Sequence, residues 1–461
     1  MNALTLQKQR MFSNHMLLVL IIPLIIEQAL AIFVGLVDGV MVSAVGEAAI
    51  SGVSLVDMIN NVINKLFGAL ATGGAVVTSQ YLGAQNRENA RRSVSQLVLM
   101  AAVFGLILMA ACLIGAEWLM RLFFGTISDD VMAAGLTYLR ITALSFPFIS
   151  LYNAGAAVFR SIGNSKISMK VSLIMNVVNV IGNAVCIYGL KMGVAGVAIP
   201  TLVSRMLAAV LILILVTRPE LPVSLKWKEL RRVNPEMMKN ILRIGVPSAC
   251  ENSIFELGRV VVVSMISLFG TSQTSANAVA NNLDSLGMMM AQAICLAMIT
   301  VVGQCVGAGD AEQVEYYIKK LMGIAYAVCL VPNLLVCVFL PQLLGLYTLS
   351  QETAELAAIL VRIHTLCGIV LWPISFVLPN ALRASNDARY TMVVGMGSMI
   401  VFRLVFSWLL CVQLGWGAVG VWIAMVIDWT CRSTLILIRV ISGKWKEKCG
   451  LAQRPQSGKA S

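Results

Sequence analysis

Carboxylates recur inside long apolar stretches of this chain that otherwise contain few charges. In chain order they are Glu27, Asp38, Asp57, Glu251, Glu256, Asp284 and Asp428. An ionisable side chain near the middle of a lipid bilayer costs about 2.5–3.5 kcal/mol on insertion scales, so it normally faces a partner or a water-filled cavity. A carboxylate in such a place can take up a proton or, with neighbouring oxygen ligands, a hard cation such as Na⁺.

Asp38 is the first candidate for an ion site because no Lys or Arg in its own apolar stretch can pair with it. Asn176, Asn179 and Asn183 recur at i, i+3 and i+7, a spacing that places three amides on one face of a helix. If that face turns toward Asp38, carboxylate and amide oxygens would form a site for Na⁺ or a proton. The alternative is that these amides only hold neighbouring helices together.

Glu27 and Glu251 each follow a proline, Pro23 or Pro247, by four residues. A proline removes a helical hydrogen bond and loosens the turn before it, and four residues are about one turn. Neutralisation of each acid by a cation could therefore bias a bend in the helix, which makes both candidates for ion coupling. The alternative is an ordinary packing kink next to an internally paired glutamate.

The remaining candidates are predicted to line a substrate cavity, where flexible thioethers would suit apolar cargo. They are Asp57, Asp284, Glu256, Met288 and Met289. Plainer alternatives exist: Glu256 can pair with Arg259 at i+3, Asp284 can be solvated near a loop, and the methionines can be packing residues. His364, the one histidine within an apolar stretch, is expected to be a satisfied buried imidazole rather than a proton carrier.

The elements that position these residues must be membrane-spanning helices. Of 461 residues 59% are apolar and 12% charged, against roughly 45–50% and about 25% in soluble proteins. Lipid-exposed strands are excluded because they leave backbone groups unpaired or must alternate in polarity, so we predict an all-α integral membrane protein. The twelve predicted spans are 16–44, 50–82, 94–115, 132–158, 167–190, 194–217, 240–268, 275–306, 318–340, 354–382, 391–412 and 416–440.

The net charge of +12 comes from Lys and Arg residues that gather in connections on one side of the predicted spans, including Arg91, Arg160 and the 218–243 segment. This is the positive-inside asymmetry. It accounts for the basicity without nucleic acid, and it predicts a multi-pass plasma-membrane protein with both termini in the cytoplasm.

The chain repeats itself at a shift of 224 residues, which brings Pro23 onto Pro247 and Gln80 onto Gln304. Six spans per repeat put both halves into the membrane in the same direction, related by an axis along the membrane normal. We therefore predict an N-terminal lobe (1–217), a cytoplasmic linker (218–239), a C-terminal lobe (240–440) and a basic tail (441–461), with a cleft between the lobes. Arg403 takes the repeat position of Asn179, which argues against two identical ion sites.

Six segments stand out across the chain: PLIIEQALAIFVGLVDGVMVSAVG (23–46), SQYLGAQNRENARRS (79–93), FRSIGNSKISMKVSLIMNVVN (159–179), GVAGVAI (193–199), GVPSACENSIFELGR (245–259) and GQCVGAGD (303–310). Taken together, they resemble the multidrug and toxic compound extrusion (MATE) family. The resemblance implies a V-shaped cavity between two six-helix lobes, and export of amphipathic, often cationic compounds against inward flow of Na⁺ or H⁺. It also implies that Asp38 belongs to a cation site. The chain departs from some members in having asparagines but no Asp in the fifth span, and His364 instead of a carboxylate in the tenth.

The sequence therefore predicts a monomeric secondary antiporter for small organic molecules, cationic ones above all, that is not an enzyme and needs no cofactor beyond the coupling ion. No G-x-x-x-x-G-K-[ST] loop for ATP is present. One alternative is a flippase for lipid-linked precursors, which would favour a strongly cationic cleft. A membrane-embedded prenyl transferase is a weaker alternative, since it would require clustered Asp motifs for Mg²⁺.

Overall fold

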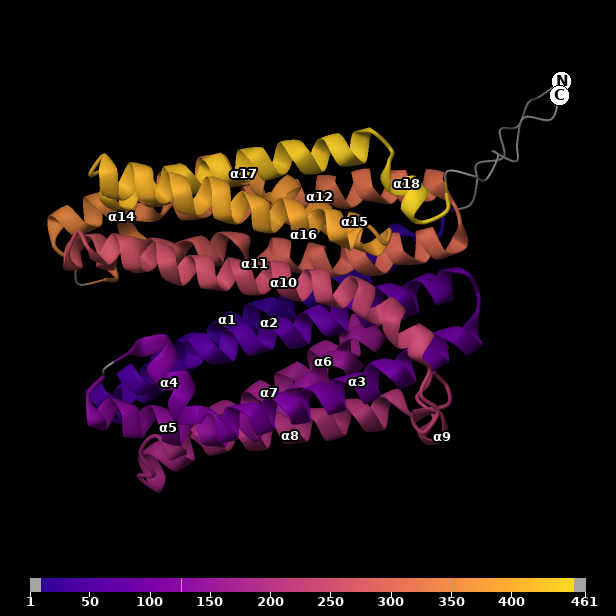
Figure 1. Ribbon diagram of the computed structural model, residues 1–461, viewed down its shortest axis with the longest axis horizontal. Helices are drawn as coiled ribbons and strands as arrows, with labels where there is room; N and C mark the ends of the chain where they lie inside the picture. Colours follow the sequence, from indigo (N-terminus) through magenta and orange to yellow (C-terminus); the bar gives the residue numbers. More distant parts are fainter. Residues whose placement is uncertain (1–9, 126, 348, 452–461) are drawn as a thin grey trace.

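The computed structural model describes residues 10–125, 127–347 and 349–451, and every regular element in these ranges is a helix. Figure 1 shows two lobes of long, roughly aligned helices. The N-terminal lobe contains α1 (Asn14–Ser43), α2 (Glu47–Gly83), α3 (Arg87–Ile114), α4 (Ala116–Phe124), α5 (Asp129–Ala143), α6 (Phe146–Ser161), α7 (Ser165–Ala184), η1 (Val185–Gly189) and α8 (Ala195–Val216). The connector contains α9 (Trp227–Leu230). The C-terminal lobe contains α10 (Pro235–Ser267), α11 (Thr271–Ala308), α12 (Ala311–Val338), α13 (Leu340–Gly345), α14 (Gln351–Trp372), η2 (Pro373–Val377), α15 (Leu378–Ala384), α16 (Ala388–Gly397), η3 (Ser398–Val405), η4 (Trp408–Gln413) and α17 (Gly417–Ile441), followed by α18 (Trp445–Lys448).

Each predicted span corresponds to one helix or to two or three consecutive helical elements. In the described residues ten helices are long and apolar enough to cross a membrane, and the bent pair α5 and α6 makes eleven. The twelfth is α10, whose 33 residues include Glu251, Glu256 and Arg259. The fourth span was expected to be one helix, but it bends by 48° between α5 and α6. Pro147 in the first turn of α6 marks the new start, because proline suits a helix beginning and not its interior.

The internal repeat is present in three dimensions, including short helices that were not predicted. α4 begins at Ala116 and α13 at Leu340, which are 224 residues apart. Gly46 and Gly270, again 224 apart, cap α2 and α11 with positive φ angles of 133° and 95°. The connector ends earlier than expected, because α10 already begins at Pro235.

The two lobes are joined at one end by reciprocal contacts between α2 and α11, which we call the inner clasp. Its four members are Gln80, Gly83, Gln304 and Gly307. A Cβ on Gly83 would collide with the carbonyl of Gln304, and one on Gly307 with the carbonyl of Gln80. The side chain of Gln80 donates to the Ala384 carbonyl at the end of α15 (2.8 Å), and that of Gln304 donates to the Ser161 carbonyl at the end of α6 (2.7 Å).

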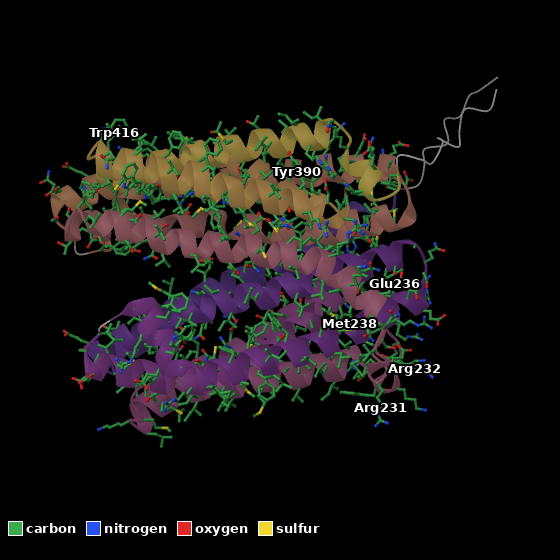
Figure 2. All side chains as sticks on the ribbon, in the orientation of Figure 1. Arg231, Arg232, Glu236, Met238, Tyr390 and Trp416 are labelled. Carbon is green, nitrogen blue, oxygen red and sulfur yellow. The ribbon has the colours of Figure 1, made fainter. Side chains whose placement is uncertain are left out.

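The N-terminal segment adds a further bridge at this same end. The hydroxyl of Tyr317 in α12 lies 2.7 Å from both the N–H and the carbonyl oxygen of Phe12. Lys320 donates to Asn14 at 2.5 Å. Arg231 and Arg232 project from the connector at this end, and Trp416 lies at the opposite end (Figure 2). The clasp therefore closes the end that the charge distribution predicts to be cytoplasmic.

The burial of α2 and α11 changes along their length. Residues 73–79 of α2 and 297–303 of α11 are all buried, whereas further from the clasp only one side of each helix is buried. Lys65 lies 18 residues before Gly83, and Met289 lies 18 residues before Gly307, which is about five turns at ~3.6 residues per turn. Both side chains therefore turn toward the opposite lobe.

The neighbours of these two residues on the same helix faces are also accessible. Met58, Asn61 and Lys65 are exposed on α2. On α11, Asn282 and Ser285 are exposed and Met289 is half-buried. A polar face turned toward the other lobe is typical of a wet cleft and not of a lipid contact. We call these six residues the cleft face.

Candidate functional site

The N-terminal lobe encloses a cavity of about 550 Å³, which we call the N-lobe cavity. It is lined by residues of α1, α2, α5, α6, α7 and α8, among them both Asp38 and Asp57. Ser54 and Asn61 line the cavity and are also exposed on α2. Since Asn61 belongs to the cleft face as well, the cavity opens toward the cleft.

The asparagine face of α7 turns toward Asp38, as its spacing predicts. Asn183 donates to Asp38 Oδ1 at 2.8 Å. The hydrogen-bond pattern around Asn179 fits when its amide nitrogen points toward Asp38. The nitrogen then donates to Oδ1 (3.1 Å) and Oδ2 (3.3 Å) of Asp38, and the amide oxygen accepts from the hydroxyl of Thr201. Asn176 lines the same cavity and lies 3.5 Å from Ser172.

Asp57 was expected in the central cleft, but the structure places it in the N-lobe cavity with Asp38. Asp57 lies 26 residues before Gly83 on α2, or about seven and a quarter turns. Its side chain is therefore rotated by about a quarter of a turn around the helix axis, away from the cleft face. The hydroxyl of Tyr138 on α5 donates to Asp57 Oδ1 at 3.2 Å. The two acids therefore form one cluster contributed by neighbouring helices.

Several polar groups of this cavity were not predicted from the sequence. Arg205 of α8 lines it and donates to Ser145 at 2.8 Å. Asn60 and Asn64 line it as well, and their side-chain oxygens, like that of the predicted Asn183, are buried without a hydrogen-bond partner. Two carboxylates and one guanidinium leave one negative charge, and unpartnered amide oxygens are ligands that a hard cation prefers. The cavity therefore suits one Na⁺ or one proton.

The acids at the two Pro–Glu positions are paired with arginines. Glu27 lies 3.9 Å from Arg160 of α6 and accepts from Ser168 (3.2 Å) and Tyr152 (3.3 Å). Glu251 lies 2.7 Å from Arg383 of α15. The two pairs are equivalent in the repeat, and each holds the first helix of its lobe against another helix of the same lobe.

Glu251 has a second cation beside it, since Arg432 of α17 is 3.8 Å away and only 3% of its side chain is exposed. We expect Glu251→Gln to lower the free energy of unfolding by about 3–5 kcal/mol, because it leaves buried arginines without their counter-charge. Glu27→Gln, which removes the partner of one more distant arginine, should cost less. Thermal unfolding of both purified variants in detergent measures the difference, and equal melting temperatures for the two would contradict the assignment.

Asp284 and Met288 were expected in the substrate cavity, but the structure turns both into the C-terminal lobe. Asp284 Oδ1 lies 2.6 Å from Nδ1 of His364. Met288 is buried, with its sulfur 3.9 Å from the amide of Asn333. Met289 does turn toward the opposite lobe.

Glu256 also turns toward the opposite lobe. It lies 11 residues, or about three turns, after Gly245, which contacts α2. The expected pairing with Arg259 is present at 3.7 Å.

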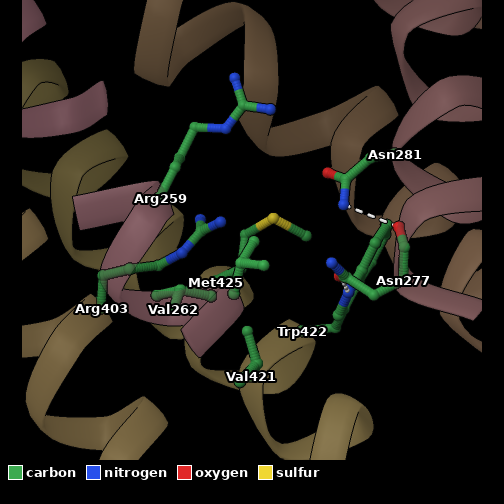
Figure 3. A pocket seen from close by; sticks show the side chains of 9 residues that line it. Arg259, Val262, Asn277, Asn281, Arg403, Val421, Trp422 and Met425 are labelled. Atoms are coloured by element: carbon green, nitrogen blue, oxygen red, sulfur yellow. Dashed lines mark hydrogen bonds between the residues drawn. The ribbon is translucent and has the colours of Figure 1, made fainter. Parts of the chain in front are cut away.

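The C-terminal lobe does not repeat the acidic cavity. At the positions 224 residues beyond Asp38, Asp57 and Asn179 stand Val262, Asn281 and Arg403. All three line a small pocket of about 40 Å³ together with Arg259, Asn277 and Trp422 (Figure 3). Arg403 lies 3.8 Å from the buried Asp428. The two lobes therefore differ in charge where their backbones correspond.

Comparison with known proteins decides the family. The MatE family model matches residues 23–185 and 247–409, two ranges related by the same 224-residue shift. The chain belongs to the MatE family. Each matched range begins inside the first helix of a lobe, α1 or α10, and extends over the helices that follow it, so the expectation of a MATE efflux transporter is confirmed.

Several known proteins are similar over nearly the whole chain. The "Uncharacterized transporter YisQ" of Bacillus subtilis is 27% identical and covers 92% of this chain and 94% of its own. The "Probable multidrug resistance protein NorM" of Thermotoga maritima is 26% identical, with 95% and 94% covered. A solved MOP superfamily transporter from Pyrococcus furiosus has a TM-score of 0.87 at 20% identity, with 95% and 96% covered. This MATE protein is thus an all-α, multi-pass membrane protein.

Proposed function

We propose that this protein is a secondary antiporter that exports amphipathic organic compounds, cationic ones among them, in exchange for Na⁺ or H⁺. It acts by alternating access in the plasma membrane, as a monomer with both termini in the cytoplasm and no cofactor beyond the coupling ion. The observation that carries the proposal is the N-lobe cavity, where two carboxylates face one guanidinium beside an open cleft. The names of two relatives support the drug class: the probable multidrug resistance protein NorM of Thermotoga maritima, and the multidrug export protein MepA of Staphylococcus aureus, which is 21% identical.

In this mechanism Asp38 and Asp57 take up one cation. Asn179 and Asn183 of α7 hold the Asp38 carboxylate of α1, and Asn176 lines the same cavity. Loading removes the net negative charge of the cavity and with it the cost of moving α1 relative to α7 and α8. The structure has its inner clasp formed and its cleft face accessible at the other end, which corresponds to the outward-open state of such a cycle. Glu27 and Glu251 have a secondary role, since each is already matched by an arginine.

The proposal is tested with the purified protein in vesicles loaded with a fluorescent organic cation. We expect dye movement when an opposing Na⁺ or proton gradient is imposed, and none when both gradients are collapsed. Imposing the two gradients separately identifies the coupling ion. Dye movement at the same rate with and without the Na⁺ and proton gradients would contradict antiport and indicate a passive route.

A further inference from the structure

The cleft face of α2 carries one charge, Lys65, at the middle of the helix. Lys65 is the central residue of Glu47–Gly83, so about 27 Å of helix lie on either side of it at ~1.5 Å per residue. Its side chain is exposed and faces the opposite lobe, because it lies about five turns from Gly83. Within the described ranges Lys65 makes no hydrogen bond or ion pair with another residue.

The opposite wall of the cleft offers Lys65 no counter-charge. The corresponding residues of α11, Asn282, Ser285 and Met289, are neutral. On α10, Glu256 is already 3.7 Å from Arg259, so that pair is internally neutral.

The two acids nearest to the cleft face are also engaged elsewhere. Asp57 accepts from Tyr138 inside the N-terminal lobe, and Asp284 lies against His364 inside the C-terminal lobe. In the part of the chain that the structure describes, the walls of the cleft are therefore positive at Lys65, while the net negative charge of the N-lobe cavity lies behind them, among α1, α2, α7 and α8.

A lysine at this depth is costly, by about 2.5–3.5 kcal/mol on insertion scales, unless water or an anion accompanies it. An anionic group of the cargo would relieve that cost and form a charge-assisted hydrogen bond with the ammonium group. Met58 and Met289 lie on the same two helix faces and offer adaptable thioethers to an apolar body. The cleft thus presents a cation together with polarizable apolar surface.

We propose that Lys65 binds a carboxylate of the cargo, so that the preferred cargo are amphipathic compounds that carry a carboxylate, zwitterions included. This inference rests on the proposed function and names the substrate class for it. Lys65 recognises the anionic group, and Met58 and Met289 contact the apolar part. The coupling ion stays in the N-lobe cavity, so cargo and ion occupy different residues.

The test compares equilibrium binding of two rhodamines that differ in one group, a free carboxylate and its ethyl ester. Binding is measured by fluorescence polarisation in detergent, without any ion gradient. We expect the acid to bind the native protein about tenfold more tightly than the ester. Lys65→Met should abolish this preference and Lys65→Arg should keep it. Met289→Leu, at a residue that contacts only the apolar part, should change the affinities for acid and ester alike and so keep their ratio.

Several outcomes overturn the proposal. These are equal binding of acid and ester by the native protein, a preference for the acid that survives in Lys65→Met, or no binding of the acid. Displacement of the bound acid by micelles of an anionic phospholipid at equal concentration would assign Lys65 to a lipid headgroup instead. Because no gradient is used, failure of antiport in vesicles with an intact acid preference would reject the proposed function and leave the role of Lys65 standing.

Discussion

Asp38→Asn is expected to reduce gradient-driven export at least tenfold while the protein still inserts and folds. The substitution removes a negative charge from the N-lobe cavity, so Asp57 and Arg205 would neutralise each other and no net charge would remain to attract a cation. The new amide still fills the same space and can accept from Asn183, which lies 2.8 Å from Asp38. Dye export from vesicles under an imposed Na⁺ or proton gradient measures the effect.

The matched control for this prediction is Glu256→Gln. Glu256 is also an acid of the first helix of a lobe, but it is paired with Arg259 at 3.7 Å and lies outside the N-lobe cavity. We expect this variant to keep most of the export rate. Export by Asp38→Asn at the native rate, or an equal loss in both variants, would show that the N-lobe cavity is not the coupling site.

Loss of the inner clasp is expected to shift the protein from the state in which the clasp is closed toward one in which the lobes separate at that end. In Gln80→Ala combined with Gln304→Ala, the helix ends at Ala384 and Ser161 each lose a donor from the other lobe. Each neutral hydrogen bond contributes about 0.5–1.5 kcal/mol, so we expect roughly a tenfold change or more in the ratio of the two states.

Ser79 reports this shift, because it is buried at the lobe contact against Gly303. In a Ser79→Cys background, we expect alkylation of this cysteine by a maleimide to rise several-fold when the two glutamines are replaced. Peptide mapping separates it from Cys329, which is buried inside the C-terminal lobe and serves as the control. Unchanged labelling at Ser79→Cys, or an equal rise at Cys329, would contradict a specific opening of the clasp.

The sequence alone predicts the features that depend on spacing along one helix. The twelve spans follow from apolar length, and the turn of Asn179 and Asn183 toward Asp38 follows from the helical period together with an acid that lacks a partner in its own span. The pairing of Glu256 with Arg259 has the same origin, since i+3 neighbours share a helix face.

Features that depend on the packing of distant helices could not be predicted in this way. The sequence does not show that Arg205 and Tyr138 complete the N-lobe cavity. Whether their side chains point toward Asp38 and Asp57 depends on how α8 and α5 pack against α1 and α2. The contact of Asp284 with His364 joins residues 80 positions apart. By contrast, the break between α5 and α6 had a local signal, Pro147, that a single 132–158 span overlooked.

The inner clasp is held by hydrogen bonds between uncharged groups. Two of its side-chain bonds join an amide to the carbonyl at a helix end, and a third joins Gln80 to the side chain of Asn386 at 3.1 Å; none of these groups carries a formal charge. When the lobes separate there, water can replace each bond at small net cost. Ionic strength, which weakens exposed ion pairs through screening, should leave these three bonds almost untouched, so their contribution to holding the lobes together depends on hydration rather than on salt.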